Sequence, residues 1–215
     1  MLPYRAGYWM RCRASELVLP LAMRELGKGT VHTPSRGTIS RLRFGWNNDS
    51  FAADVDFLCA VAETSRRHNG NILECGSGLS TLLLAALTKN RVWTLEHSEE
   101  WLERTRDALR RFGLEDRAML RHAPLKSYGD FSWYELPADL PAHFSVVVCD
   151  GPPALTTPGA RYGLLPVTHE RIRGSRIFLD DAQRAEERCV IDRWRQSFGV
   201  TVESDAEFSV LRVEL

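Results

Sequence analysis

The chain lacks the features that mark several common classes of protein. Its five cysteines form no Cys-x-x-Cys pair and are odd in number, which argues against a disulfide framework and favours a reducing compartment. It has no apolar run long enough to span a membrane, because the stretch LVLPLAM at 17–23 is short and is interrupted by Pro20. It contains no internal repeat and no low-complexity segment. We therefore expect a soluble, cytoplasmic, globular protein with no membrane partner.

The chain also lacks an overall excess of charge of either sign. Lys plus Arg and Asp plus Glu both number 28, so the net charge does not indicate a protein that binds polyanions. The exception is the segment 1–43, in which eight basic side chains stand against two acidic ones. This segment either faces an anionic partner such as nucleic acid or pairs with the acidic remainder of the chain. We favour the second interpretation and do not expect nucleic acid as a partner.

Apolar runs alternate with helix-like segments from residue 51 onward. Helices are expected from 51 to about 67 and over 79–87, 98–112 and 183–198, and a long loop over 123–143. Buried strands are expected at 71–75, 91–96, 117–123, 144–150 and 175–181, followed by a terminal pair at 200–204 and 207–215. This alternation predicts an α/β fold: a doubly wound, Rossmann-like, seven-stranded sheet, mostly parallel with a C-terminal antiparallel hairpin.

The first 50 residues differ in character from the rest. They contain one short helix-like stretch at 15–26 and then a connection rich in Gly, Thr, Pro and Ser at 27–40. We expect residues 1–50 to form an N-terminal cap or lid segment and residues 51–215 to form the main domain.

Carboxylates follow four of the five expected parallel strands. Glu74 ends the first strand, Glu96 the second, Asp150 the fourth, and the pair Asp180–Asp181 the fifth. In open α/β sheets the ligand binds beyond the carboxyl ends of the strands. The sequence therefore predicts an acidic ligand site at that edge.

The glycine-rich turn after the first strand lacks two features of phosphate-binding loops. The turn, LECGSGLST at 73–81, has Thr81 where a dinucleotide-binding loop has its third glycine, and the first lysine after it is Lys89, too far on for a P-loop. Glu74 would repel a phosphate and attract an ammonium group. Glu96 could accept both hydroxyls of a ribose. These residues predict a ligand that is a nucleoside with a cationic or amino-acid-like tail.

Three motifs resemble those of the class I S-adenosylmethionine-dependent methyltransferases. They are LECGSGLST, the acidic strand end WTLEHS, and VVVCDGPP after the fourth strand. Together with the following RY and FLDDA, the set resembles a bacterial group of small methyltransferases whose substrates are largely unassigned. The resemblance covers about residues 44–215. It implies S-adenosylmethionine as cofactor.

The resemblance also implies which residues contact the cofactor. Glu74, Gly76 and Gly78 would hold the methionine moiety, Glu96 the ribose hydroxyls, and His97 would border the adenine. The loop that follows the third strand lacks the acidic residue that many members place beside the adenine.

Residues before the first domain helix complete this set. Trp46 and Asn47, in the segment FGWNND, would form part of a lid, although Trp46 is equally compatible with a packed cap residue. The implied cofactor-binding residues are Trp46, Asn47, Glu74, Gly76, Ser77, Gly78, Ser80, Thr81, Glu96, His97 and Asp150.

Asp150, Asp180 and Asp181 match the positions of a metal site in one subset of the family. The catechol- and caffeoyl-type O-methyltransferases bind a divalent metal through an Asp after strand four and an acidic or Asp-Asn pair after strand five. Oxygen ligands suit Mg²⁺, Ca²⁺ or Mn²⁺, and such an ion could lower the pKa of a substrate hydroxyl. Two alternatives remain: Asp181 caps the helix near residue 183, and Asp150 acts alone as a base or an orienting group.

These observations predict an enzyme that transfers a methyl group from S-adenosylmethionine to a small molecule, at a hydroxyl oxygen. Asp150 is the candidate catalytic residue, and Arg161 and Tyr162 are candidate substrate contacts, although surface residues at a helix start explain them equally well. The alternatives are a methyltransferase acting on nucleic acid or on a protein or amine acceptor, an NAD-dependent oxidoreductase, and a non-catalytic module that binds the cofactor. The acceptor and the oligomeric state stay open, a homodimer among the options.

Overall fold

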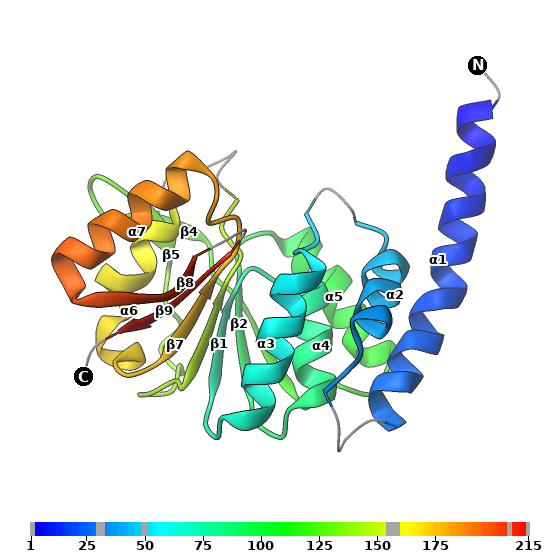
Figure 1. Ribbon diagram of the computed structural model, residues 1–215, viewed down its shortest axis with the longest axis horizontal. Coiled ribbons are helices and arrows are strands. Elements are labelled where there is room, and N and C mark those ends of the chain that lie inside the picture. Colours follow the sequence, from blue (N-terminus) through cyan, green and yellow to red (C-terminus); the bar gives the residue numbers. More distant parts are fainter. Residues whose placement is uncertain (1–2, 29–32, 49–50, 154–159, 206–207, 214–215) are drawn as a thin grey trace.

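A seven-stranded sheet forms the centre of the molecule (Figure 1). The computed structural model describes residues 3–28, 33–48, 51–153, 160–205 and 208–213. The strand order is β3-β2-β1-β6-β7-β9-β8; β9 runs antiparallel to both of its neighbours and the other pairings are parallel. The strands of this sheet are β1 (Ile72–Cys75), β2 (Val92–Glu96), β3 (Ala118–His122), β6 (Val146–Cys149), β7 (Arg176–Leu179), β8 (Val200–Asp205) and β9 (Ser209–Val213). The expected sheet with its C-terminal hairpin is confirmed.

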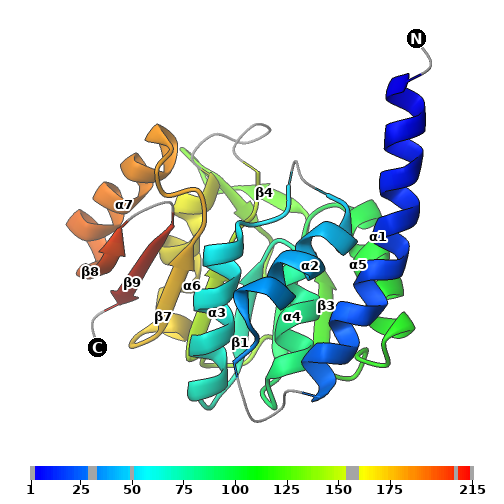
Figure 2. The same ribbon diagram turned by 45° about the vertical axis from the view of Figure 1, so that its right-hand side comes forward.

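Alternating side chains of the central strands feed two hydrophobic cores, one on each face of the sheet. Ile72 and Val148 belong to the first core, whereas Leu73 and Cys149 belong to the second. Figures 1 and 2 show one set of helices on each side. The first core is covered by α3 (Val55–Arg67), α4 (Leu79–Leu87) and α5 (Glu99–Arg111), and the second by α6 (Leu164–Ile172) and α7 (Ala185–Phe198).

Two helices precede this α/β unit, where the sequence suggested one short helix and a connection. Helix α1 spans Pro3–Lys28, and α2 spans Arg36–Trp46, so that α2 begins within the connection expected at 27–40 and extends beyond it. The Ser35 hydroxyl caps α2 by accepting a hydrogen bond from the backbone N–H of Thr38, at 3.1 Å. Both helices add buried side chains to the first core. The division of the chain at residue 50 stays a prediction, since residues 49–50 lie outside the described part.

Three further segments differ from expectation. Asp54 caps α3, so this helix begins four residues later than predicted. The expected loop at 123–143 contains a small antiparallel hairpin of β4 (Leu125–Ser127) and β5 (Ser132–Tyr134). A turn of 3₁₀ helix, η1 (Ala160–Gly163), leads directly into α6, which the sequence pattern did not indicate. Among the described residues, no helix is both long and apolar enough to cross a membrane.

Gly45 allows α1 and α2 to pack closely. A Cβ atom at this position would lie 2.7 Å from the backbone of Leu19. Gly37, in the same helix, has only ordinary contacts around an added Cβ, at 3.6 Å or more. We expect Gly45→Ala to lower the free energy of unfolding by about 1–3 kcal/mol, because α1 must move away.

Thermal unfolding with Gly37→Ala as the matched control checks this prediction. The control should leave Tm unchanged or raise it, because alanine favours the helix. Equal Tm values for the two variants would show that the α1–α2 contact contributes little to stability.

Candidate functional site

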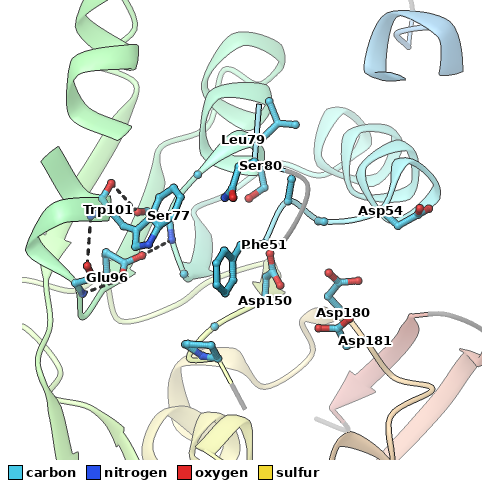
Figure 3. Close-up of a pocket in the computed structure, with 18 of the residues that line it drawn as sticks. Phe51, Asp54, Ser77, Leu79, Ser80, Glu96, Trp101, Asp150, Asp180 and Asp181 are labelled. Atoms are coloured by element: carbon cyan, nitrogen blue, oxygen red, sulfur yellow. Dashed lines mark hydrogen bonds between the residues drawn. The ribbon is translucent and has the colours of Figure 1, made fainter. Parts of the chain in front are cut away.

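A cavity of about 680 Å³ lies at the carboxyl edge of the parallel strands. Its walls come from the loops after β1, β2, β6 and β7, from the end of α2 and from residues 51–54. Arg43 ties this last segment to α2, since its guanidinium donates to the carbonyl oxygens of Ala53 and Ala52 at 3.1 and 3.4 Å. Figure 3 shows Glu96, Ser77 and Trp101 on one side of the cavity, Asp180 and Asp181 on the other, and Asp150 between them.

The glycines after β1 and β6 bring two backbones into contact at the floor of the cavity. Gly76 has a φ of 91°, which a residue with a side chain rarely adopts. A Cβ on Gly76 would lie 3.0 Å from the nitrogen of Gly151, and the Gly151 N–H donates to the carbonyl oxygen of Cys75 at 2.7 Å. A ligand can therefore lie directly against the backbone here.

Glu74 holds the glycine turn from beneath and does not line the cavity. Its side chain is fully buried, and Oε2 accepts hydrogen bonds from the hydroxyls of Thr81 and Thr94, both at 2.7 Å. The Thr81 hydroxyl oxygen in turn accepts from the Gly78 N–H at 3.0 Å. Thr81, where a dinucleotide loop has glycine, thus links the carboxylate to the turn. Burial raises the pKa of Glu74 to about 7, although these hydroxyls oppose the rise.

Glu96 is held as a charged acceptor at the other side of the turn. Its Oε2 accepts from the Ser77 N–H at 2.8 Å, and Oε1 accepts from the Ser98 N–H at 2.9 Å. Burial opposes ionisation, but the contacts with His97 and these two N–H groups outweigh it and lower the pKa of Glu96. Each carboxylate oxygen has further acceptor capacity. Glu96 can therefore bind a pair of hydroxyls without being reoriented.

Aromatic side chains form the wall above Glu96. Trp46 and Trp101 line the cavity, and the Arg104 guanidinium lies 4.8 Å from each ring centroid. Arg104 also donates to the carbonyl oxygen of Trp46 at 2.8 Å, which ties α2 to α5. Phe51 packs edge-on against Trp101, at 6.2 Å between ring centroids, and is 58% exposed. This wall offers apolar surface to a planar ring.

Asp150, Asp180 and Asp181 converge on the opposite side. One carboxylate oxygen from each lies within 4.8 Å of those from the other two. Burial raises the pKa of Asp180, and the charges of Asp150 and Asp181 raise it further. Burial likewise raises the pKa of Asp150, against the opposing effect of Arg161. The protein thus holds these carboxylates together at an electrostatic cost.

Two arginines offset part of this charge. Arg161 is 3% exposed, and its Nη2 lies 3.2 Å from Asp181 Oδ2 and 3.5 Å from Asp150 Oδ1. Arg184 Nη1 lies 2.7 Å from the same Asp181 oxygen. Glu187 adds a fourth carboxylate, 3.5 Å from Arg161 Nη1. When all are ionised, four carboxylates face two guanidinium groups, which leaves two negative charges unbalanced.

Most of the residues singled out from the sequence lie around this one cavity. Those that line it are Trp46, Gly76, Ser77, Gly78, Ser80, Glu96, His97, Asp150, Arg161, Asp180 and Asp181. Those that do not are Asn47, Glu74, Thr81 and Tyr162. Asn47 ends α2 in the left-handed conformation, with φ at 52°. Tyr162 is buried in the second core beneath the guanidinium of Arg193, 3.5 Å from its ring centroid. Their assigned roles in binding stay predictions.

Several lining residues escaped the sequence analysis. Phe51 and Trp101 were expected only as helix residues, and Tyr134 only as part of a loop. Tyr134 is fully buried, and its hydroxyl has no hydrogen-bond partner in the part of the chain that the structure describes. Burial raises the pKa of Tyr134 well above its usual value, so the hydroxyl keeps its proton. The aromatic residues clustered at 128–134 were the one signal in the sequence that could have indicated a buried role for Tyr134.

Burial of Glu74 predicts a stability that falls as the pH rises. The pKa of Glu74 is about 7 in the folded chain and near the ordinary glutamate value in the unfolded chain. The contribution of protonated Glu74 to the free energy of unfolding is therefore complete below about pH 4.5 and is lost as the pH rises through 7. Glu74→Gln removes the ionisation and can keep an oxygen for both threonine hydroxyls. Relative to wild type, Tm of this variant should therefore rise by several degrees between pH 5.5 and pH 8.

The exposed Glu63→Gln is the control, because Glu63 lies on the surface of α3, where it pairs with Arg67. Its Tm should follow the wild type at both pH values. A Tm difference between Glu74→Gln and wild type that does not change with pH would contradict the assigned cost of ionising Glu74.

Comparison with known proteins identifies the fold. No family model matches the chain, and no curated protein sequence matches it. The solved O-methyltransferase of Bacillus cereus in complex with SAH (S-adenosylhomocysteine) is similar over 93% of this chain and 100% of its own, with a TM-score of 0.59 and 17% identity. The O-methyltransferase TomG of Streptomyces achromogenes, in complex with SAM, is similar over 87% of this chain and 94% of its own, with a TM-score of 0.59 and 14% identity.

A third similar structure is the SAH-bound methyltransferase PaMTH1 of Podospora anserina. It covers 100% of this chain and 97% of its own, with a TM-score of 0.55 and 16% identity. At these identities the likeness concerns the fold. The chain has the fold of the class I S-adenosylmethionine-dependent methyltransferases, as its sequence motifs suggested.

Proposed function

We propose that this protein transfers a methyl group from S-adenosylmethionine to a hydroxyl oxygen of a small molecule. The observation that carries the proposal is the division of one cavity into two chemically different ends. Glu96 lies at one end, Asp180 and Asp181 lie at the other, and Asp150 lies between them beside the glycine turn (Figure 3). The similar structures are methyltransferases with SAM or SAH bound, which supports the same cofactor here.

The residues at the first end fit this cofactor. Glu96 is ionised and has free acceptor capacity for the two ribose hydroxyls. The backbone contact of Gly76 with Gly151 leaves no side chain between the ligand and the strand ends. Trp101 and His97 border the same end and suit an adenine ring. The volume of about 680 Å³ lies in the range of small-molecule and cofactor sites.

Asp150 stands where the chemistry would occur. S-adenosylmethionine supplies an electrophilic methyl group on a positively charged sulfur. The acceptor oxygen must lose its proton as it forms the new bond to carbon, and the carbon–sulfur bond breaks to leave a neutral thioether. Asp150 lines the cavity beside the glycine turn, and in the absence of a bound cation its carboxylate can accept this proton. The remaining catalysis is alignment of oxygen, carbon and sulfur.

A divalent cation fits the second end. Asp150, Asp180 and Asp181 would hold it, since one carboxylate oxygen from each converges on the same place and, when ionised together with Glu187, they exceed the charge of Arg161 and Arg184. Three carboxylates favour Mg²⁺, Ca²⁺ or Mn²⁺. Such an ion stabilises the deprotonated form of a hydroxyl bound beside it. This site supports oxygen as the acceptor atom.

Cofactor choice and the role of Glu96 can be tested together. S-adenosylhomocysteine should raise Tm of the wild-type protein by several degrees and NAD⁺ should not, because binding to the folded state alone stabilises it. By calorimetry, Glu96→Gln should weaken S-adenosylhomocysteine binding by about tenfold or more, through loss of charge-assisted hydrogen bonds.

Glu103→Gln is the matched control, since Glu103 lies exposed on α5 and pairs with Arg106. It should bind S-adenosylhomocysteine as the wild type does. A wild-type protein that NAD⁺ stabilises and S-adenosylhomocysteine does not would contradict the proposed cofactor.

The metal site predicts binding of Mg²⁺ or Mn²⁺ to the protein saturated with S-adenosylhomocysteine. Asp180→Asn should weaken Mn²⁺ binding in a calorimetric titration by about tenfold or more, because it removes one anionic ligand. Asp192→Asn, at an exposed position of α7, should bind Mn²⁺ unchanged. Full methyl-transfer activity in excess chelator would remove the metal from the proposal.

A further inference from the structure

Arg161 connects the ends of the two strands that carry the acidic cluster. Its guanidinium reaches from η1 to β6 and β7 and is 3% exposed. Nη2 donates to the carbonyl oxygen of Asp150 at 2.5 Å, and Nη1 donates to the carbonyl oxygen of Asp180 at 2.6 Å. One planar group therefore bridges the backbones of two residues whose side chains belong to the cluster.

The bridge lies where the pairing of the two strands stops. The paired positions of β6 and β7 end at Cys149 and Leu179, and the last backbone hydrogen bond runs from the Asp180 N–H to the Cys149 carbonyl at 3.1 Å. Beyond it, the guanidinium takes the place of the next strand-to-strand contact. The distance between the Asp150 and Asp180 backbones is thus set by a rigid fork of donors.

The same group also contacts the carboxylates. Nη2 lies 3.2 Å from Asp181 Oδ2 and 3.5 Å from Asp150 Oδ1, and Nη1 lies 3.5 Å from Glu187 Oε1. These contacts offset the repulsion among the like charges of the carboxylates. Because both terminal nitrogens are engaged by the protein, Arg161 acts on a ligand through the aspartates.

We propose that Arg161 is the positioning residue of the acidic cluster, holding Asp150, Asp180 and Asp181 at the spacing that a divalent cation requires. The cluster is then formed before the cation arrives, and no rearrangement of strand ends opposes binding. This inference rests on the proposed function, since it assumes the metal site described above. In this role Arg161 does not make the direct contact with substrate that the sequence had suggested.

Lysine and glutamine at this position separate charge from geometry. Lysine keeps the charge, but a single ammonium cannot span two carbonyl oxygens as the guanidinium fork does. Glutamine loses the charge as well. If geometry is what Arg161 provides, both variants should lose affinity for the cation.

Arg171 offers a matched control. Its Nη1 also donates to two backbone carbonyl oxygens, those of Leu140 and Pro141, at 3.0 and 2.6 Å, and it does not line the cavity. Arg171→Lys should lower Tm through loss of similar hydrogen bonds. It should leave binding of the cation and of S-adenosylhomocysteine unchanged.

The test measures Mn²⁺ binding by electron paramagnetic resonance on the full chain saturated with S-adenosylhomocysteine. Arg161→Lys and Arg161→Gln should raise the Mn²⁺ Kd by tenfold or more while the Kd for S-adenosylhomocysteine stays within about threefold of wild type. A loss of affinity for Mn²⁺ without a loss of affinity for S-adenosylhomocysteine distinguishes a positioning role from a general loss of structure.

Five results would overturn the inference or its basis. Wild-type Mn²⁺ affinity in Arg161→Lys, or an equal loss in Arg171→Lys, removes the positioning role. Loss of S-adenosylhomocysteine binding in both Arg161 variants makes Arg161 a determinant of the fold instead. A wild-type chain that binds S-adenosylhomocysteine but no Mn²⁺ overturns this inference and leaves the cofactor intact. A wild-type chain that binds no S-adenosylhomocysteine overturns the proposed function itself.

Discussion

Four carboxylates at the ends of four neighbouring strands are the constraint on which the site depends. Glu96 ends β2 and Glu74 lies near the end of β1, whereas Asp150 and Asp180 directly follow β6 and β7; these four strands lie side by side in the sheet. The cost of burying each carboxylate is offset by different partners. Glu96 has backbone N–H groups, Glu74 has threonine hydroxyls, and the two aspartates have Arg161. These different solutions give the cavity two chemically different ends from a single row of acidic side chains, and the proposed function assigns hydroxyl groups to one end and a cation to the other.

The helices before the α/β unit give this row of carboxylates an enclosed wall. Trp46 arrives at the cavity because α2 packs on the first core, and Arg104 joins it to Trp101 across the cavity mouth. Arg43 fixes the segment that carries Phe51. The end of the cavity that contains Glu96 is therefore shaped both by the helices before the α/β unit and by the α/β unit itself. The end with Asp180 and Asp181 is lined mainly by residues that follow β6 and β7, and under the proposed function variation in these loops can change the acceptor without changing the cofactor.

The sequence predicted the strands and the acidic edge because both depend on local patterns. Apolar runs of strand length identify buried strands, and a parallel sheet brings all their ends together. Helix α2 was missed because the residues Gly, Thr, Pro and Ser before it indicated a connection, although Ser35 as N-cap and the helical spacing of Ile39, Leu42 and Trp46 were local signals. Arg161 was taken for a surface residue or a substrate contact, because its burial depends on carboxylates and carbonyls 11 to 26 positions away in sequence. The position of Tyr134 likewise depends on a short hairpin inside a presumed loop.

The central claim is that Glu96 and the glycine turn hold S-adenosylmethionine with its sulfur directed toward Asp150. A crystal structure of the protein with S-adenosylhomocysteine tests this most directly. The account predicts the ribose hydroxyls on the Glu96 carboxylate, the amino-acid end over the Gly76–Gly78 turn, and the sulfur on the side of Asp150. A ligand bound with its ribose away from Glu96, or bound outside this cavity, would contradict it.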